Sequence, residues 1–160
     1  MPKIIDTVRE KLSERPKSIL FCKLGNKATS IPDGLKSYTA YSEFLSVCNG
    51  ARCGDIDLWD TNSIPNNQFY VSEIQGMQDA WLCIGQILYE PLMLSKQDGK
   101  VYLFSKNELN DMPMYIFDDF YNLIINYVFG VKYKNIVVNA DNDRWFIFLK
   151  ENDFFSINDV

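Results

Sequence analysis

The chain has 160 residues, of which 47% are apolar and 14% aromatic. A chain of this length buries roughly two thirds of the surface that its unfolded form exposes, so it can form a full core without staples. The apolar content argues against extended disorder, and no linker or low-complexity tract interrupts the sequence. We therefore expect a single domain over residues 1–160.

The net charge of −5 is unevenly distributed along the chain. Residues 1–37 hold eight Lys or Arg against four Asp or Glu, a net +4, whereas residues 38–160 hold eight against seventeen, a net −9. Phosphate binding needs clustered basic residues, so an acidic body disfavours nucleic acid and favours a basic partner. The alternative is that the charge serves solubility alone.

The sequence favours a cytoplasmic protein. Charges scattered through residues 1–16 break up any secretory signal, and no segment reaches the roughly 20 apolar residues of a membrane span. Disulfides are uncommon in a reducing compartment, and structural zinc needs four Cys or His ligands. Because the chain has no histidine, we expect its four cysteines to be small buried apolar residues: Cys22, Cys48, Cys53 and Cys83.

The first third of the chain predicts two helices and a short strand. Apolar residues at helical spacing predict an amphipathic helix over 3–14, and SILF at 18–21 is typical of a short strand. A second helical pattern runs over 34–48 and stops at Asn49-Gly50. Glycine adopts the left-handed conformation that ends a helix at little steric cost, and Asn tolerates it.

The segment after this stop alternates in a period of two. Asp55, Asp57 and Trp59 share one face of a predicted strand, and Ile56 and Leu58 share the other. This alternation indicates a half-buried strand whose aliphatic face points inward.

The rest of the chain predicts more strands and then two helices. Strands are expected at 80–87, 91–95 and 100–105, with a turn at 97–99; helices are expected at 117–130 and 143–152, the last capped by Asp141 or Asn142. Residues 68–75 favour neither helix nor strand. Strands grouped between helices indicate an α+β fold with a largely antiparallel sheet flanked by helices.

The missing histidine excludes Ser-His-Asp, Cys-His and histidine–metal sites. Carboxylates remain, and the spacing Asp55-x-Asp57-x-x-Asp60 offers oxygen ligands of the kind that Mg²⁺ or Ca²⁺ prefers. It lacks the glycine and terminal glutamate of an EF-hand loop, so solvent-facing acidic residues on a strand explain it better. We therefore expect no catalytic residue, metal or other cofactor.

Protein binding fits the same residues better than catalysis does. A tryptophan exposed beside charged residues is typical of a protein-binding hot spot, although a helix or loop could instead cover Trp59. Two carboxylates at 118 and 119 could join those of the strand, or could simply favour the start of a helix. The candidate partner-binding residues are Asp55, Asp57, Trp59, Asp60, Asp118 and Asp119.

Over residues 31–150 the sequence resembles the SUKH superfamily, which includes bacterial Syd-like and immunity proteins, a fungal cell-wall assembly regulator and herpesvirus proteins. The segments that carry the resemblance are IPDGLKSYTAYSEFLSVCNGA, WLCIGQ, LMLSKQDGKVYLF, FDDFYNLIINYVFG, KYKNI and DRWFIFLKEN, in this order. Its most specific features are Asn49-Gly50, the hairpin at 98–102 and the helix start at 117–120.

The resemblance implies a SUKH-like α+β domain without catalytic residues. For stand-alone bacterial members it implies an immunity role, in which the protein binds a polymorphic toxin domain, often a nuclease, and blocks it. The acidic body suggests that such a toxin domain is basic. Two alternatives remain: a regulatory scaffold that binds host proteins, as the fungal relatives suggest, and a metal-assisted hydrolase built on Asp55, Asp57 and Asp60. The oligomeric state stays open.

Overall fold

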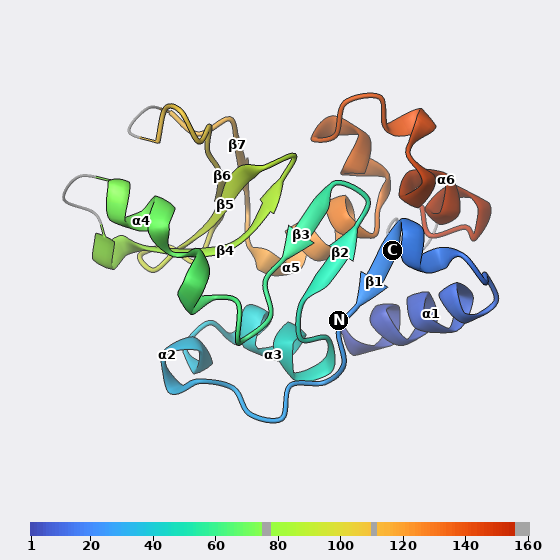
Figure 1. Cartoon of the computed structure of the whole chain (residues 1–160), viewed down its shortest axis with the longest axis horizontal. Helices are drawn as coiled ribbons and strands as arrows, with labels where there is room; N and C mark the ends of the chain where they lie inside the picture. Colours follow the sequence, from blue (N-terminus) through green and yellow to red (C-terminus); the bar gives the residue numbers. More distant parts are fainter. Residues whose placement is uncertain (75–77, 110–111, 156–160) are drawn as a thin grey trace.

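An open antiparallel sheet runs through the molecule (Figure 1). The computed structural model describes residues 1–74, 78–109 and 112–155. Within them seven strands follow one another across the sheet in chain order, each antiparallel to the next: β1 (Cys22–Leu24), β2 (Ala51–Cys53), β3 (Ile56–Leu58), β4 (Trp81–Ile87), β5 (Glu90–Ser95), β6 (Val101–Leu103) and β7 (Tyr115–Phe117). The predicted α+β class with a largely antiparallel sheet is confirmed.

Six α-helices accompany the sheet in the described residues. They are α1 (Pro2–Ser13), α2 (Asp33–Lys36), α3 (Thr39–Val47), α4 (Phe69–Glu73), α5 (Phe120–Asn122) and α6 (Arg144–Glu151). A π-helical segment, η4 (Leu123–Val128), continues α5, and short 3₁₀ turns lie at Ser18–Leu20, Pro65–Asn67, Gln78–Ala80, Val131–Asn135 and Ala140–Asn142.

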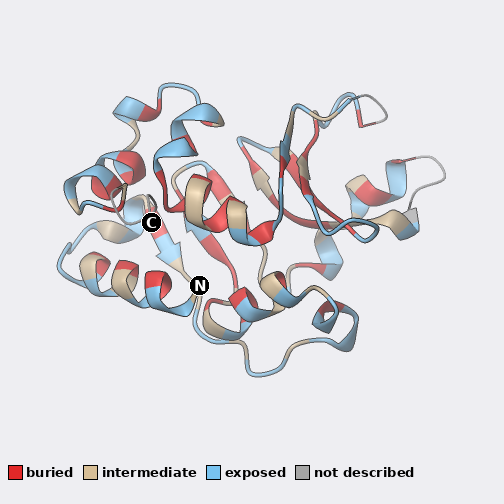
Figure 2. Cartoon of the chain, turned by 180° about the vertical axis from the view of Figure 1, so that it is seen from behind, coloured by how far each residue is buried: buried red, intermediate tan, exposed pale blue. Residues whose placement is uncertain are grey.

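The helices cover the two faces of the sheet unequally. Apolar side chains of α1, α3, α5, η4 and α6 pack with one face of the sheet into the main core, which Figure 2 shows from the helix side. On the other face a smaller core joins α4 to β4, β5 and β6 through Val71, Ile74, Cys83, Met93, Phe104 and Leu109. Residues 91–95 of β5 are therefore buried on both faces, whereas Lys23 of β1 and Arg52 of β2 are exposed. No helix among the described residues packs on the face of β1–β3 opposite the main core, which we call the open face.

The alternation predicted for β3 is confirmed. Ile56 and Leu58 are buried in the main core, while Asp57 lies between them on the open face and is only partly buried. The four cysteines are free and buried, as predicted. No helix of the described residues is both long and apolar enough to span a membrane.

Two predicted helices begin or divide differently in the structure. The 34–48 pattern forms two helices, because Tyr38 has a ψ of 79°, outside the helical range. The helix expected at 117–130 begins only at Phe120, because Phe117 is the last residue of β7. Gly50 does adopt a left-handed φ of 84°, three residues after α3 ends at Val47.

Strand β1 begins later than predicted, and strands β2 and β7 were not predicted. Residues 18–20 form a 3₁₀ turn and the strand starts at Cys22, so the predicted strand at 18–21 is wrong. Strands β2 and β7 were not expected, because three residues show too little alternation to indicate a strand. Residues 69–73, where the pattern was ambiguous, form α4.

A buried polar contact joins the β2–β3 turn to the C-terminal helix. The hydroxyl of Tyr133 donates to Asp143 Oδ2 at 3.0 Å and accepts from the backbone N–H of Asp55 at 3.0 Å. The other oxygen of Asp143 caps α6, since it accepts from the N–H of Trp145 at 2.7 Å. Asp143, not the predicted Asp141 or Asn142, is therefore the cap. Gly54 has a φ of 58°, and a Cβ there would lie 2.1 Å from the Tyr133 hydroxyl.

The turn between β4 and β5 is backbone-strained. Ile87 pairs with Glu90, so Leu88 and Tyr89 form a two-residue loop, and both have left-handed φ values, 52° and 68°. Such loops favour Asn-Gly, because a side chain with a Cβ costs roughly 1–2 kcal/mol in this conformation.

The Asp143 contact generates a stability prediction. Asp143→Ala removes the cap of α6 and the acceptor of the buried Tyr133 hydroxyl, and should lower the free energy of unfolding by about 1–3 kcal/mol. Urea denaturation measures this change. The control is Asp141→Ala, an exposed residue in the preceding 3₁₀ turn, which should cost far less. Equal losses for both variants would contradict the role of Asp143.

Candidate functional site

The open face of β1–β3 carries a row of polar side chains. The strand register places Lys23, Arg52, Asp57 and Gln86 side by side across four neighbouring strands. Asp57 Oδ2 accepts a hydrogen bond from Gln86 Nε2 at 2.8 Å, and Asp57 Oδ1 lies 3.9 Å from Arg52 Nε. The side chain of Arg52 is 73% exposed, and exposed ion pairs contribute only about 0–1 kcal/mol. This row is therefore a hydrated, charged surface with little role in stability.

Asp55 lies at one end of this face, in the β2–β3 turn, and is exposed. Its backbone is fixed by two hydrogen bonds: the N–H donates to Tyr133, and the carbonyl accepts from the N–H of Leu88 at 3.0 Å. Partial burial raises the pKa of the Asp55 carboxyl, and the nearby carboxylates of Asp143 and Asp57 raise it further, while Arg52 lowers it. We call Asp55, Asp57 and Asp143 the acidic turn. Its like charges repel one another.

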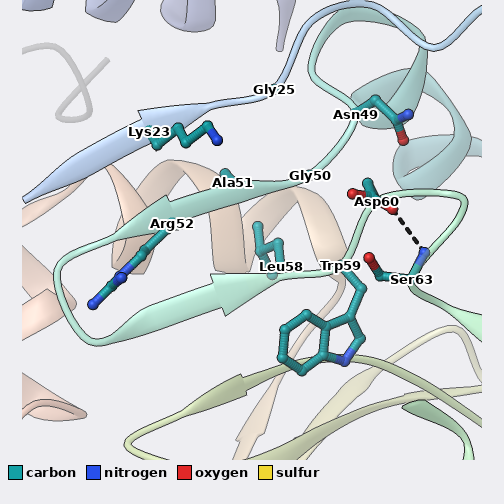
Figure 3. Close-up of a pocket in the computed structure, with 10 residues that line it drawn as sticks. All are labelled: Lys23, Gly25, Asn49, Gly50, Ala51, Arg52, Leu58, Trp59, Asp60 and Ser63. Carbon is teal, nitrogen blue, oxygen red and sulfur yellow. Dashed lines mark hydrogen bonds between the residues drawn. The ribbon is translucent and has the colours of Figure 1, made fainter. Parts of the chain in front are cut away.

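Trp59 and Asp60 lie beyond the other end of β3. Trp59 is partly buried against the main core, and its indole nitrogen is buried beside the Cys83 thiol. Burial raises the pKa of that thiol, against the lowering effects of the Gly85 carbonyl and the indole N–H. In Figure 3 the indole extends away from Asp60. Much of Trp59 is therefore covered, which fits a structural role for this residue better than an exposed binding hot spot.

Asp60 has a structural contact of its own. Its Oδ1 accepts from the backbone N–H groups of Asn62 and Ser63, at 2.9 and 2.7 Å, which fixes the turn after β3. Lys23, Arg52 and Asp60 border a shallow hollow of about 320 Å³ at this end of the open face (Figure 3). The rim of the hollow carries both positive and negative side chains. Nothing else in the described residues indicates a ligand there.

Asp118 and Asp119 do not join the strand aspartates. They lie between β7 and α5. Strand β7 is four strand spacings from β3, roughly 19 Å at about 4.8 Å per spacing. Asp119 Oδ1 accepts from the N–H of Asn122 at 2.6 Å and caps α5. The helix-start explanation accounts for Asp119, and the aspartates of the strand and of the helix start lie on separate surfaces.

The described residues contain no group of three or more His, Cys, Asp or Glu side chains that could hold a metal ion. The physical reason is the extended strand: Asp57 and Asp60 are three residues apart, roughly 10 Å at 3.3 Å per residue. In addition, Asp57 is bonded to Gln86, and Asp60 to its own turn. The arrangement gives no support to a hydrolase built on these aspartates.

Four residues of this region were missed by sequence reasoning: Arg52, Gln86, Tyr133 and Asp143. The first two need the strand register, which a three-residue strand does not reveal. Tyr133 and Asp143 lie far along the chain from Asp55, and only the tertiary fold brings them together. Asp143 did carry a local signal, because an Asp directly before an apolar helical run is a typical N-cap.

No protein-family model matches this sequence. None of the curated proteins is detectably similar to it either.

Repulsion within the acidic turn generates a pH prediction. Because the folded-state pKa of Asp55 is raised, the folded state holds this proton more tightly than the unfolded state, and stability falls as the pH rises through that pKa. Asp55→Asn removes the charge and should raise the melting temperature at pH 7. The gain should shrink as the pH is lowered towards 4.

Thermal unfolding of both proteins from pH 7 to pH 4 measures this difference. Asp118→Asn, which removes an exposed charge outside the acidic turn, is the matched control and should show a smaller gain. A loss of stability in Asp55→Asn at pH 7 would contradict the repulsion.

Proposed function

We propose that this chain is a SUKH-like, cytoplasmic immunity protein that binds a basic toxin domain and neutralises it without catalysis. The observation that carries the proposal is the acidic turn at the edge of the open sheet face. There Asp55 and Asp57 are held near Asp143, at a cost in mutual repulsion, on a surface that no described helix covers. A positively charged partner would relieve this repulsion.

The charge distribution supports a basic partner. Residues 38–160 carry a net −9, and such a field speeds the approach of a positively charged protein. A rigid sheet face needs little reordering when it binds, so less of the contact energy is lost to ordering. Inhibition then requires only that the bound protein block the toxin's own site, which is consistent with a chain that has no histidine.

A regulatory scaffold is the second candidate. The open face and its polar row would serve this function equally well, because scaffolds also bind proteins through exposed, preformed surfaces. The two functions differ in the partner: an immunity protein binds one toxin tightly, whereas a scaffold binds enzymes or regulators of its host.

Affinity capture tests the proposal. The full chain, tagged and expressed in its native cell, should retain at moderate salt a larger protein with a basic domain, and that domain should be toxic when expressed without this chain. Recovery of metabolic or cell-wall enzymes alone would favour the scaffold. Recovery of no protein at all would overturn both.

A charge-reversal pair tests the acidic turn. Asp55→Lys should weaken binding of the captured protein by on the order of tenfold, mostly through slower association, and should reduce the salt dependence. Asp118→Lys makes the same change of charge at an exposed position directly after β7, the edge strand farthest from β1. Binding kinetics at two salt concentrations compare them, and equal effects would show that only net charge matters.

A further inference from the structure

We propose that the β4–β5 turn, Leu88-Tyr89, is the contact point for a basic protein segment, with Tyr89 as its anchor and the acidic turn as the charge that pairs with it. This inference rests on the proposed function and names the surface through which it acts. It uses none of the residues that the sequence indicated except Asp55 and Asp57.

The backbone of the β4–β5 turn is strained, and nothing in the core offsets this strain. Leu88 and Tyr89 both adopt left-handed backbone, which bulky side chains rarely do, in a loop type that favours Asn-Gly. Burial of the side chains does not offset this strain, because Tyr89 is 70% exposed and Leu88 is 38% exposed. Two large apolar side chains at the tip of a hairpin therefore serve stability poorly, and strained positions of this kind cluster at functional sites.

The β4–β5 turn lies directly beside the acidic turn. The N–H of Leu88 donates to the carbonyl of Asp55. The β2–β3 and β4–β5 turns therefore meet at the same end of the strands (Figure 1). Tyr89 is followed by Glu90, whose carboxylate accepts a hydrogen bond from the backbone N–H of Lys106. Arg52 lies beside Asp57, and the ammonium of Lys106 lies 5.9 Å from the centre of the Tyr89 ring.

The charge of this surface and the ring of Tyr89 both favour a basic partner. The three carboxylates of the acidic turn outnumber Arg52, the basic side chain that acts on Asp55, so this surface is acidic and selects a positively charged segment. Tyrosine is enriched at binding hot spots, since its ring buries a large area with few rotatable bonds and its hydroxyl can still bond. The ring of Tyr89 already has one cation above it, and an arginine of the partner can stack on such a ring in the same way.

The experiment combines a cross-linker with a turn repair. The photoreactive residue p-benzoylphenylalanine replaces Tyr89 in one protein and Tyr121, a 46% exposed tyrosine on α5, in the other. Irradiation of native cells should give a covalent adduct at position 89 and little at 121. The cross-linked peptide of the partner should carry a net positive charge.

The repair variant is L88N/Y89G, which installs the residues that the turn prefers. Its melting temperature should rise, while its binding of the cross-linked protein should fall on the order of tenfold or more. Because the variant is more stable, lost binding cannot result from unfolding. Leu20→Asn, which removes an exposed leucine from the 3₁₀ turn before β1, is the control and should bind normally.

The outcomes separate this inference from the proposed function. Adducts at position 121 but not 89, an acidic cross-linked peptide, or full binding by L88N/Y89G would overturn the turn's role and leave the immunity role standing. No adduct at either position, together with empty affinity capture, would overturn both.

Discussion

The carboxylate of Asp143 connects three parts of the fold that are distant in sequence. It caps α6 with one oxygen and accepts the Tyr133 hydroxyl with the other, and that hydroxyl accepts the backbone N–H of Asp55. Burial of the Tyr133 phenol raises its pKa, so it stays a neutral donor across the physiological range. Since a buried hydroxyl left unpaired costs free energy, this contact fixes the β2–β3 turn relative to the C-terminal helix. The position of Asp55 at the edge of the sheet depends on it.

The unequal cover of the sheet decides what the molecule can bind. The main core of α1, α3, α5, η4 and α6 occupies one face, and α4 covers the other only over β4–β6. The remaining open face ends at two adjoining turns, one acidic and one apolar. Both turns carry features that lower stability, repulsion in the first and backbone strain in the second. Proteins commonly keep such features where function requires them.

The sequence predicted the fold class and the longer elements, because α1 has a clear helical period and β4 is a seven-residue, largely apolar run. It missed β2 and β7, which have three residues each and are defined by their neighbours. The alternation of β3 placed Asp57 on the outward face, yet Trp59 proved partly covered, because the cover comes from the tertiary fold. Tyr89 was not among the candidate residues for a similar reason: its left-handed backbone and exposure are properties of a hairpin whose register the sequence does not reveal.

Hydrogen exchange of the chain, alone and bound to the protein that it captures, tests the central claim most directly. We propose that the partner docks at the end of the open face where the β2–β3 and β4–β5 turns meet. Binding should slow exchange of the backbone amides in residues 52–57 and 86–90, while the amides of α1 and α6 exchange as before. Protection confined to the helix layer, or around Asp118 and Asp119, with no change at these two turns, would contradict the account.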